Sequence, residues 1–329
     1  MRLTIQGAIL TTALGLGISG ASATDLKLAD FQPPSHFIVE GTYKPFADKI
    51  AKETGGDVKV SVFMGGELGA GPAEQYNRAV DGVADIAFGL PGYTASNFPK
   101  TLLTELPGVI TAETGTQRIV DNIDMLSDEY RRVQLVGLWN NAPNLLFTSE
   151  KPIRGIEDLK GLKIRVPSRN AGLVVEAWGG SPVSMPAPEI YNAMQTGVID
   201  GAMIDATTLR SFRLAEVTKY ITKGMDTTIS SFFLIMNRNS FGGLSEEQQK
   251  VVLEAGREAA LNANKSWLGI ADKTLADFAA TEGKEVITLS PEEAEKFNKA
   301  SAPVVGRVIE EAEASGIEAK AFVEALRKK

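Results

Sequence analysis

Short runs along the chain alternate between apolar and polar residues, which is the pattern of β-strands with one buried face. Residues 25–29 and residues 58–63 are two such runs, the second reading Val-Lys-Val-Ser-Val-Phe. Between them, residues 36–54 show the spacing of an amphipathic helix, and glycine pairs at 55–56 and 65–66 mark turns. This order predicts a β-α-β unit. Such units form parallel sheets, whose carboxyl edges collect the loops and helix N-termini that bind ligands.

Part of this pattern occurs twice in the chain. A helix that ends at Gly82 is followed by a short strand, and the same residue types recur 115 positions further on, where the helix ends at Gly197. In both copies the glycine suits a left-handed helix cap, and a predicted strand precedes the helix, at residues 58–63 and at residues 162–167. Because 329 residues exceed what one hydrophobic core usually organises, the repeat predicts two similar α/β lobes. The matched residues are Glu74, Tyr76, Asn77, Gly82, Val83, Asp85 and Ala87 in the first copy and Glu189, Tyr191, Asn192, Gly197, Val198, Asp200 and Ala202 in the second.

Two long helices are predicted near the C-terminal end. The first begins near Leu244 and opens with a capping box formed by Ser245 and Gln248. The second opens at Ser290, with Pro291 in the first turn, where the missing N–H of proline costs nothing. We expect these helices to brace both lobes.

The two predicted lobes have expected boundaries in the sequence. Lobe I is predicted to comprise residues 24–146 plus about 235–275, and lobe II residues 147–234 plus about 276–329. We expect hinge strands between the lobes, near residues 142–149 and 232–238. The predicted fold class is therefore α/β, with two lobes that are able to move relative to each other.

Residues 1–23 have the composition of a cleavable export signal. Arg2 supplies the positive start, residues 8–18 form a short apolar run, and Ala21-Ser22-Ala23 matches the small-x-small cleavage pattern. A buried N-terminal helix is the alternative, but the glycines of the segment disfavour it. We therefore expect a signal peptide over residues 1–23 and a mature protein that begins at Thr24 in the periplasm. The sequence has no cysteine, which excludes disulfides, thiolate metal sites and a lipid-modified N-terminal cysteine.

The charge balance argues against nucleic acid as a partner. The formal net charge is −7, and no segment concentrates Lys and Arg into the basic surface that a phosphate backbone requires. No later stretch reaches the roughly 18 apolar residues of a membrane span. An acidic protein that binds an anion needs a local positive group, since its long-range field repels the ligand.

Motifs for catalysis, metals and cofactors are mostly missing from the sequence. The string Gly15-x-Gly17-x-x-Gly20 lies inside the predicted export signal, and neither a phosphate-binding loop nor a Gly-x-Ser-x-Gly motif occurs. His36 is the only histidine, so a histidine-based metal cluster is excluded and a catalytic triad would depend on that residue alone. His36 lies in a Pro-rich loop, where it either shapes the loop or contacts a ligand. We expect no cofactor, no metal and no enzymatic activity.

Arg165 is the residue whose chemistry points to a ligand. It interrupts an otherwise apolar predicted strand, residues 162–167, and an unpaired buried charge costs several kcal/mol. The planar guanidinium matches a carboxylate with two parallel hydrogen bonds. Arg165 is thus paired either with an internal Asp or Glu or with an anionic ligand.

Four segments resemble, in order, the motifs of the solute receptors of tripartite ATP-independent periplasmic (TRAP) transporters, the DctP-type family. They are residues 29–34, residues 60–69, residues 161–167 and residues 189–201. The resemblance covers essentially the whole mature chain. It implies a two-lobed, type II-like periplasmic binding protein that closes on a carboxylate held by Arg165. It also implies two integral membrane subunits as partners, one small and one large, driven by an ion gradient.

The sequence departs from the family pattern at two places. After Asp200-Gly201 many relatives continue with Glu-Asn or Glu-His, whereas this chain continues to Asp205, the nearest polar substitute. In sialic-acid receptors of this type a second arginine precedes the strand that ends in Phe-Thr-Ser/Thr, and Asn144 opens the corresponding stretch here. A second acidic group on the ligand would lack that partner, which favours a monocarboxylate with an aromatic or hydroxylated body. The predicted ligand-binding residues are Arg165, His36, Phe37, Glu67, Gly89, Tyr93, Asn144, Ser168, Met185, Asp205 and Phe232.

Two other functions stay open at this point. A secreted hydrolase or lyase acting on an organic acid would need a base in the cleft, with His36 or Glu67 as the candidates. A receptor for an ATP-driven importer would have the same fold but a different membrane partner.

Overall fold

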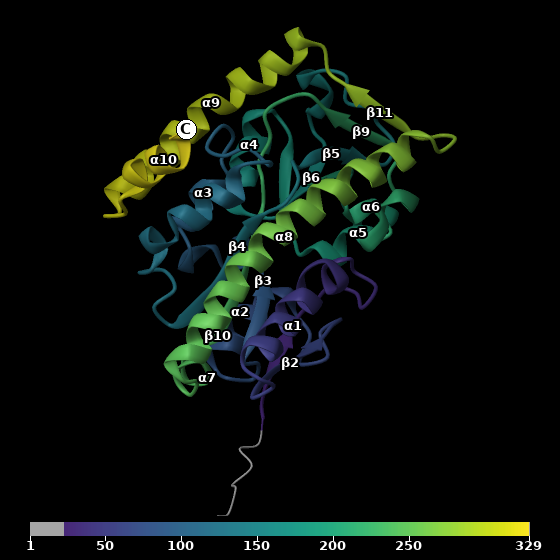
Figure 1. Ribbon diagram of the computed structural model, residues 1–329. Coiled ribbons are helices and arrows are strands. Elements are labelled where there is room, and N and C mark those ends of the chain that lie inside the picture. The colour runs from purple at the N-terminus through teal and green to yellow at the C-terminus, as the bar shows by residue number, and fades with distance from the viewer. Residues whose placement is uncertain (1–22, 329) are drawn as a thin grey trace, which may run out of the picture.

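The computed structural model describes residues 23–328. The predicted export signal, residues 1–23, therefore lies outside the described residues except for Ala23. Two β-sheets with helices packed around them make up the described chain (Figure 1). Within this part of the chain no helix is both long enough and apolar enough to cross a bilayer.

The first sheet has the strand order β2-β1-β3-β10-β4. Strands β1, β2 and β3 pair in parallel, and β10 runs antiparallel to both β3 and β4. Alternation of apolar and polar residues in β1 and β2 puts one face of each strand into the core, as the sequence predicts. The bounds are β1 Thr24–Ala29, β2 Val58–Phe63, β3 Ile86–Gly89, β4 Val133–Asn140 and β10 Ser231–Asn237.

The second sheet has the strand order β11-β9-β5-β8-β6-β7. Strand β6 is parallel to β7 and β8, β11 is parallel to β9, and β5 runs antiparallel between β8 and β9. The bounds are β5 Leu145–Thr148, β6 Lys163–Val166, β7 Ser181–Ser184, β8 Gly201–Ile204, β9 Tyr220–Lys223 and β11 Glu285–Thr288.

The internal repeat is confirmed as a repeated piece of structure. The backbone N–H of Lys27 in β1 donates to the Asp85 carboxylate at 2.8 Å, and that of Lys163 in β6 donates to Asp200 at 2.7 Å. Helices α2 (Gln75–Val80) and α5 (Ile190–Gln195) precede these aspartates. The glycine that follows each helix has a φ of 73°, a conformation that glycine adopts without strain.

Helix α8, Glu246–Ala279, spans both sheets and packs against β4 of the first and β11 of the second. In Figure 1 it runs diagonally across the molecule from β10 towards β9 and β11. Its approach to β4 is close, because a Cβ at Gly256 would lie 2.1 Å from the carbonyl oxygen of Val136. The capping box of Ser245 and Gln248 is present.

The remaining helices pack around the two sheets and on one another. Helix α9 packs on α4, and α10 packs on α9 and α3, so the C-terminal helices contact elements that follow strands of both sheets. The long C-terminal helices are therefore confirmed. The bounds are α1 Lys44–Glu53, α3 Gly115–Asp121, α4 Arg169–Ala177, α6 Thr208–Ser211, α7 Arg238–Gly242, α9 Pro291–Ala314 and α10 Ala319–Arg327.

Besides α8, the chain crosses between the sheets at residues 141–144 and at residues 224–230. The second predicted hinge, residues 232–238, overlaps β10, which pairs with the first sheet from Ser231 to Asn237, so the crossing segment lies just before it and the hinge itself stays a prediction. An apolar run predicts a strand but not the sheet in which that strand pairs. Residues 231–234 thus belong with the first sheet, and the division into two lobes otherwise stays a prediction.

Candidate functional site

A small cavity lies where the carboxyl edges of the two sheets meet. Its open volume of about 40 Å³ exceeds the roughly 10–15 Å³ that one water molecule needs. Segments that follow β1, β3, β6 and β8 line it, together with residues of β10 and α8. The lining residues are Phe31, Gln32, His36, Leu90, Tyr93, Asn141, Arg165, Pro167, Ala187, Ile204, Asp205, Thr207, Thr208, Phe212, Ser230, Phe232 and Trp267.

Arg165, the third residue of β6, is 1% exposed and lines this cavity. Its Nε donates to the carbonyl oxygen of Met185 at 2.8 Å, and Nη2 donates to the hydroxyl of Tyr93 at 3.3 Å. A long contact of 3.5 Å joins Nη1 to the carbonyl oxygen of Met203. None of these partners is charged, and no Asp or Glu of residues 23–328 forms an ion pair with Arg165. Burial lowers the pKa of the guanidinium, which nonetheless stays charged near neutrality.

The hydroxyl of Tyr93 forms hydrogen bonds that connect a segment after β3 of the first sheet to Arg165 of the second. Tyr93 belongs to the 3-10 helix Pro91–Asn97 that follows β3, and its hydroxyl also accepts from the backbone N–H of Ala187 at 2.9 Å. Burial raises the pKa of this hydroxyl, so it stays protonated. The adjacent Gly92 allows close approach, since a Cβ there would lie 2.9 Å from the carbonyl oxygen of Pro167. Segments that follow strands of both sheets therefore surround Arg165.

Asp205 forms a second polar group in the cavity wall. Its carboxylate accepts from Asn141 Nδ2 at 2.9 Å and from the backbone N–H of Thr207 at 2.9 Å, and burial raises its pKa. Asn141 Oδ1 in turn accepts from the N–H of Ser230 at 2.8 Å. Because Asn141 and Ser230 lie in the two crossing segments, this network connects the cavity to the segments that join the sheets.

The remaining wall is aromatic. Trp267 on α8 packs against Phe232 of β10 with ring centroids 4.9 Å apart, and the His36 ring lies 5.6 Å from Trp267. His36 Nδ1 accepts from the backbone N–H of Ile38 at 3.2 Å, and burial lowers the pKa of His36 to about 3. The histidine is therefore neutral near pH 7. An apolar body fits against these rings, while Arg165 and Asp205 supply polar contacts.

The cavity brings together five of the predicted binding residues: His36, Tyr93, Arg165, Asp205 and Phe232. Met185 takes part through its carbonyl oxygen, which orients Arg165.

The other predicted residues do not line the cavity. The Phe37 ring stacks on His36 at 4.3 Å and packs on Trp267. Glu67 is exposed in the turn after β2, and Gly89 lies against Phe233 within the first sheet. Asn144 donates to Thr228 Oγ1 at 3.1 Å, which joins the two crossing segments, and Ser168 caps α4.

Several lining residues were missed at the sequence level. Gln32 follows the first predicted strand, so its position at a carboxyl edge was a usable signal. Asn141, Ser230 and Trp267 carry no such signal, because only the pairing of β10 with β4 and the path of α8 bring them to the cavity.

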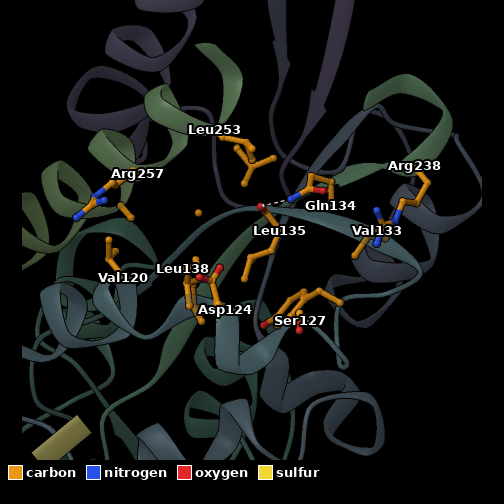
Figure 2. A pocket seen from close by; sticks show the side chains of 15 residues that line it. Val120, Asp124, Ser127, Val133, Gln134, Leu135, Leu138, Arg238, Leu253 and Arg257 are labelled. Atoms are coloured by element: carbon orange, nitrogen blue, oxygen red, sulfur yellow. Dashed lines mark hydrogen bonds between the residues drawn. The ribbon is translucent and has the colours of Figure 1, made fainter. Parts of the chain in front are cut away.

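A larger groove of about 310 Å³ lies along β4, away from Arg165 (Figure 2). Its arginines already have partners: Arg257 faces Asp121 at 3.4 Å, and Arg238 Nε donates to the carbonyl oxygen of Arg131 at 3.1 Å. The groove therefore offers no buried charge in need of an anion. No group of three or more acidic, histidine or cysteine side chains suited to a metal gathers in residues 23–328.

The sequence model of bacterial extracellular solute-binding proteins, family 7, matches residues 28–312. The chain belongs to this family. Proteins of this family are solute receptors, and the resemblance to TRAP solute receptors is confirmed. A solute-binding protein of Albidiferax ferrireducens is 28% identical over 300 residues, which are 87% of this chain and 86% of the relative.

Solved structures of TRAP receptors confirm the α/β receptor fold. A marine metagenome protein described as specific for aromatic acid ligands, in complex with 3-hydroxybenzoate, has a TM-score of 0.87 at 27% identity and covers 93% of this chain and 97% of its own. A periplasmic protein of Bordetella bronchiseptica with bound (R)- and (S)-mandelate has a TM-score of 0.84 at 27% identity, with coverages of 92% and 98%.

Proposed function

We propose that this receptor binds a small monocarboxylate with an aromatic or hydroxylated body and passes it unchanged to the membrane subunits of a TRAP transporter. The observation that carries the proposal is the Arg165 guanidinium, which is buried in the cavity without a carboxylate partner among residues 23–328. Removing a charge from water is costly unless an opposite charge and hydrogen bonds compensate. A ligand carboxylate supplies both.

The walls of the cavity support the choice of ligand. Phe232 and Trp267 favour an apolar body over a fully polar one. The structural relatives with bound 3-hydroxybenzoate and mandelate hold ligands of this class. Arg165 is the one cationic side chain in the described cavity lining, which supports one carboxylate and not two.

The geometry favours binding over catalysis. His36 has a pKa of about 3 and its Nδ1 is already engaged by a backbone N–H, so it is a poor general base. Glu67, the other candidate base, is exposed outside the cavity. Export to the periplasm and docking to two ion-coupled membrane subunits form part of the proposal, and membership of the family supports both. The alternative of an ATP-driven importer predicts a different membrane partner beside the same receptor fold.

A thermal-shift screen of the purified protein against organic acids tests this function. At 100 times its dissociation constant a ligand adds about 2.7 kcal/mol to the free energy of unfolding, which raises Tm by a few degrees. We expect shifts with small monocarboxylates such as hydroxybenzoates and mandelates, and none with their amides. A panel in which no carboxylate raises Tm would contradict the proposal.

Arg165→Lys makes the test specific to the anchor. Lysine keeps the charge but cannot form two parallel hydrogen bonds, so calorimetry should show a loss of at least about 1.5–3 kcal/mol in binding free energy. Arg169→Lys is the control, because Arg169 is exposed and pairs with Glu311 on α9. Unchanged affinity in Arg165→Lys would show that the carboxylate is held elsewhere.

A further inference from the structure

We infer that His36 and Trp267 form a second, uncharged polar subsite that receives a hydroxyl or carbonyl oxygen of the bound acid. Resting on the proposed function, this inference names the feature of the ligand that the receptor selects. A monocarboxylate with a suitably placed hydroxyl should bind more tightly than its parent acid. A dicarboxylate of the same shape should bind more weakly.

Trp267 provides a donor that has no partner. Its side chain lines the cavity and is 2% exposed, and its Nε1 is buried without a hydrogen bond in the described structure. Buried N–H groups are nearly always paired, so an unpaired one in a cavity wall indicates a group that the ligand supplies. The indole is held in place by Phe37 at 4.7 Å and Phe232 at 4.9 Å between ring centroids.

His36 provides a second donor beside it. Because Nδ1 accepts the backbone N–H of Ile38, the proton of the neutral ring is on Nε2. No residue of the described chain forms a hydrogen bond with Nε2. Burial lowers the pKa of His36 to about 3, so this donor carries no charge at any pH near neutrality. The centroids of the two rings lie 5.6 Å apart, and both residues line the same cavity, which is why we assign their N–H groups to one subsite.

The charges around the cavity explain why a neutral oxygen is preferred to a second carboxylate. Among the described lining residues the one cation is Arg165, and its carboxylate partner comes from the ligand. Asp205 lines the same cavity as an acceptor already engaged by Asn141 and Thr207. A second carboxylate would therefore lose its hydration, gain no opposite charge and meet a like charge. A hydroxyl or carbonyl oxygen needs only the two N–H donors.

Calorimetry with benzoate, its three monohydroxy isomers and isophthalate measures this selectivity. In the wild-type protein at least one hydroxybenzoate should bind about 5-fold or more tightly than benzoate, and isophthalate at least about 10-fold more weakly. Trp267→Phe should reduce the hydroxyl preference to within about 2-fold. Trp139→Phe is a matched control. The Nε1 of Trp139 is likewise buried without a hydrogen bond, and its ring packs against Trp267, but Trp139 does not line the cavity.

A second readout does not depend on the folding of the Trp267 variant. The chain has three tryptophans, so a proton–nitrogen NMR spectrum shows three indole N–H signals. Trp139→Phe and Trp178→Phe identify the Trp267 signal by elimination. The preferred hydroxybenzoate should move it further than benzoate does.

Three results would overturn the inference. The first is equal affinity for benzoate and all its hydroxy isomers, and the second is a hydroxyl preference that survives in Trp267→Phe. Both would leave the proposed function intact. Failure of all five acids to bind would also reject the inference, and the wider panel of acids then decides separately whether the proposed function stands.

Discussion

Glu105 is a buried carboxyl near Arg165 whose charge depends on pH. It is 2% exposed, and its Oε2 accepts from the hydroxyl of Ser168 at 2.7 Å. Burial raises the pKa of Glu105 from 4.5 to about 7, although hydrogen bonds from Ser168 and Ser231 and the charge of Arg165 oppose the rise. This carboxyl therefore changes its charge close to neutrality.

The raised pKa predicts that Glu105 makes the protein less stable as pH rises. Between about pH 4.5 and pH 7 the folded carboxyl holds a proton that the unfolded chain releases, so stability is highest below this window and falls through it. The loss amounts to about 3 kcal/mol, at about 1.4 kcal/mol for each unit of pKa. Urea unfolding from pH 4.5 to pH 8 should show this decline in the wild type and a flatter curve in Glu105→Gln.

The comparison between the two curves isolates Glu105 from other buried carboxyls. Burial also raises the pKa of Asp30, to about 6. Asp30 lowers stability with rising pH equally in the wild type and in Glu105→Gln, so it does not affect the difference between their curves. Glu254→Gln, an exposed substitution on α8, serves as the control and should follow the wild type. Parallel curves for wild type and Glu105→Gln would show that Glu105 titrates normally.

Among the elements, α8 depends on one close contact with β4 of the first sheet. Gly256→Ala would place a Cβ 2.1 Å from the carbonyl oxygen and 2.6 Å from Cγ1 of Val136, so the helix must move away from β4. We expect a loss of about 1–3 kcal/mol or more in the free energy of unfolding. On the same helix, Gly269 has no atom within 4 Å of an added Cβ.

Gly269→Ala is therefore the matched control, and its expected effect has the opposite sign. Alanine is the better helix former by about 0.5–1 kcal/mol, so this variant should unfold at higher denaturant concentration than the wild type. Equal stabilities for the two variants would mean that α8 does not depend on its contact with β4.

Local signals explain which elements the sequence could predict. Strands β1, β2 and β6 show alternation or an apolar run, and the starts of α8 and α9 carry their caps at Ser245 and Ser290. The cavity was predictable where its residues lie in or just after such strands, as for Arg165 in β6. Asn141, Ser230 and Trp267 were not, because long-range strand pairing and helix packing place them.

For the molecule as a whole, contacts between the halves predict closure on the ligand. Besides Tyr93, they include Asn170 Nδ2, which donates to the carbonyl oxygen of Leu102 at 3.0 Å. A ligand favours the closed state by the contacts that only this state completes. Small-angle scattering should therefore give a smaller radius of gyration with a bound acid than without it.

Tyr93→Phe tests the cause of closure. It removes the hydroxyl that bridges Arg165 and Ala187, so affinity and the change in radius should fall together. Tyr191→Phe also loses a bonded hydroxyl, but its partner Glu216 lies in the same half, so closure should persist. Tight binding with no change in scattering, in a protein shown to be open beforehand, would argue against closure.

The repeated backbone has a consequence for the direction in which the solute lies. Lys27 and Lys163 occupy equivalent places, since each donates to the aspartate of its own copy, and two residues further along stand Ala29 and Arg165. This piece of the scaffold is repeated, while the positive charge lies in one copy only. We therefore expect an acid in the cavity to bind in one orientation, with its carboxylate in the second half and the rest of the molecule against the first.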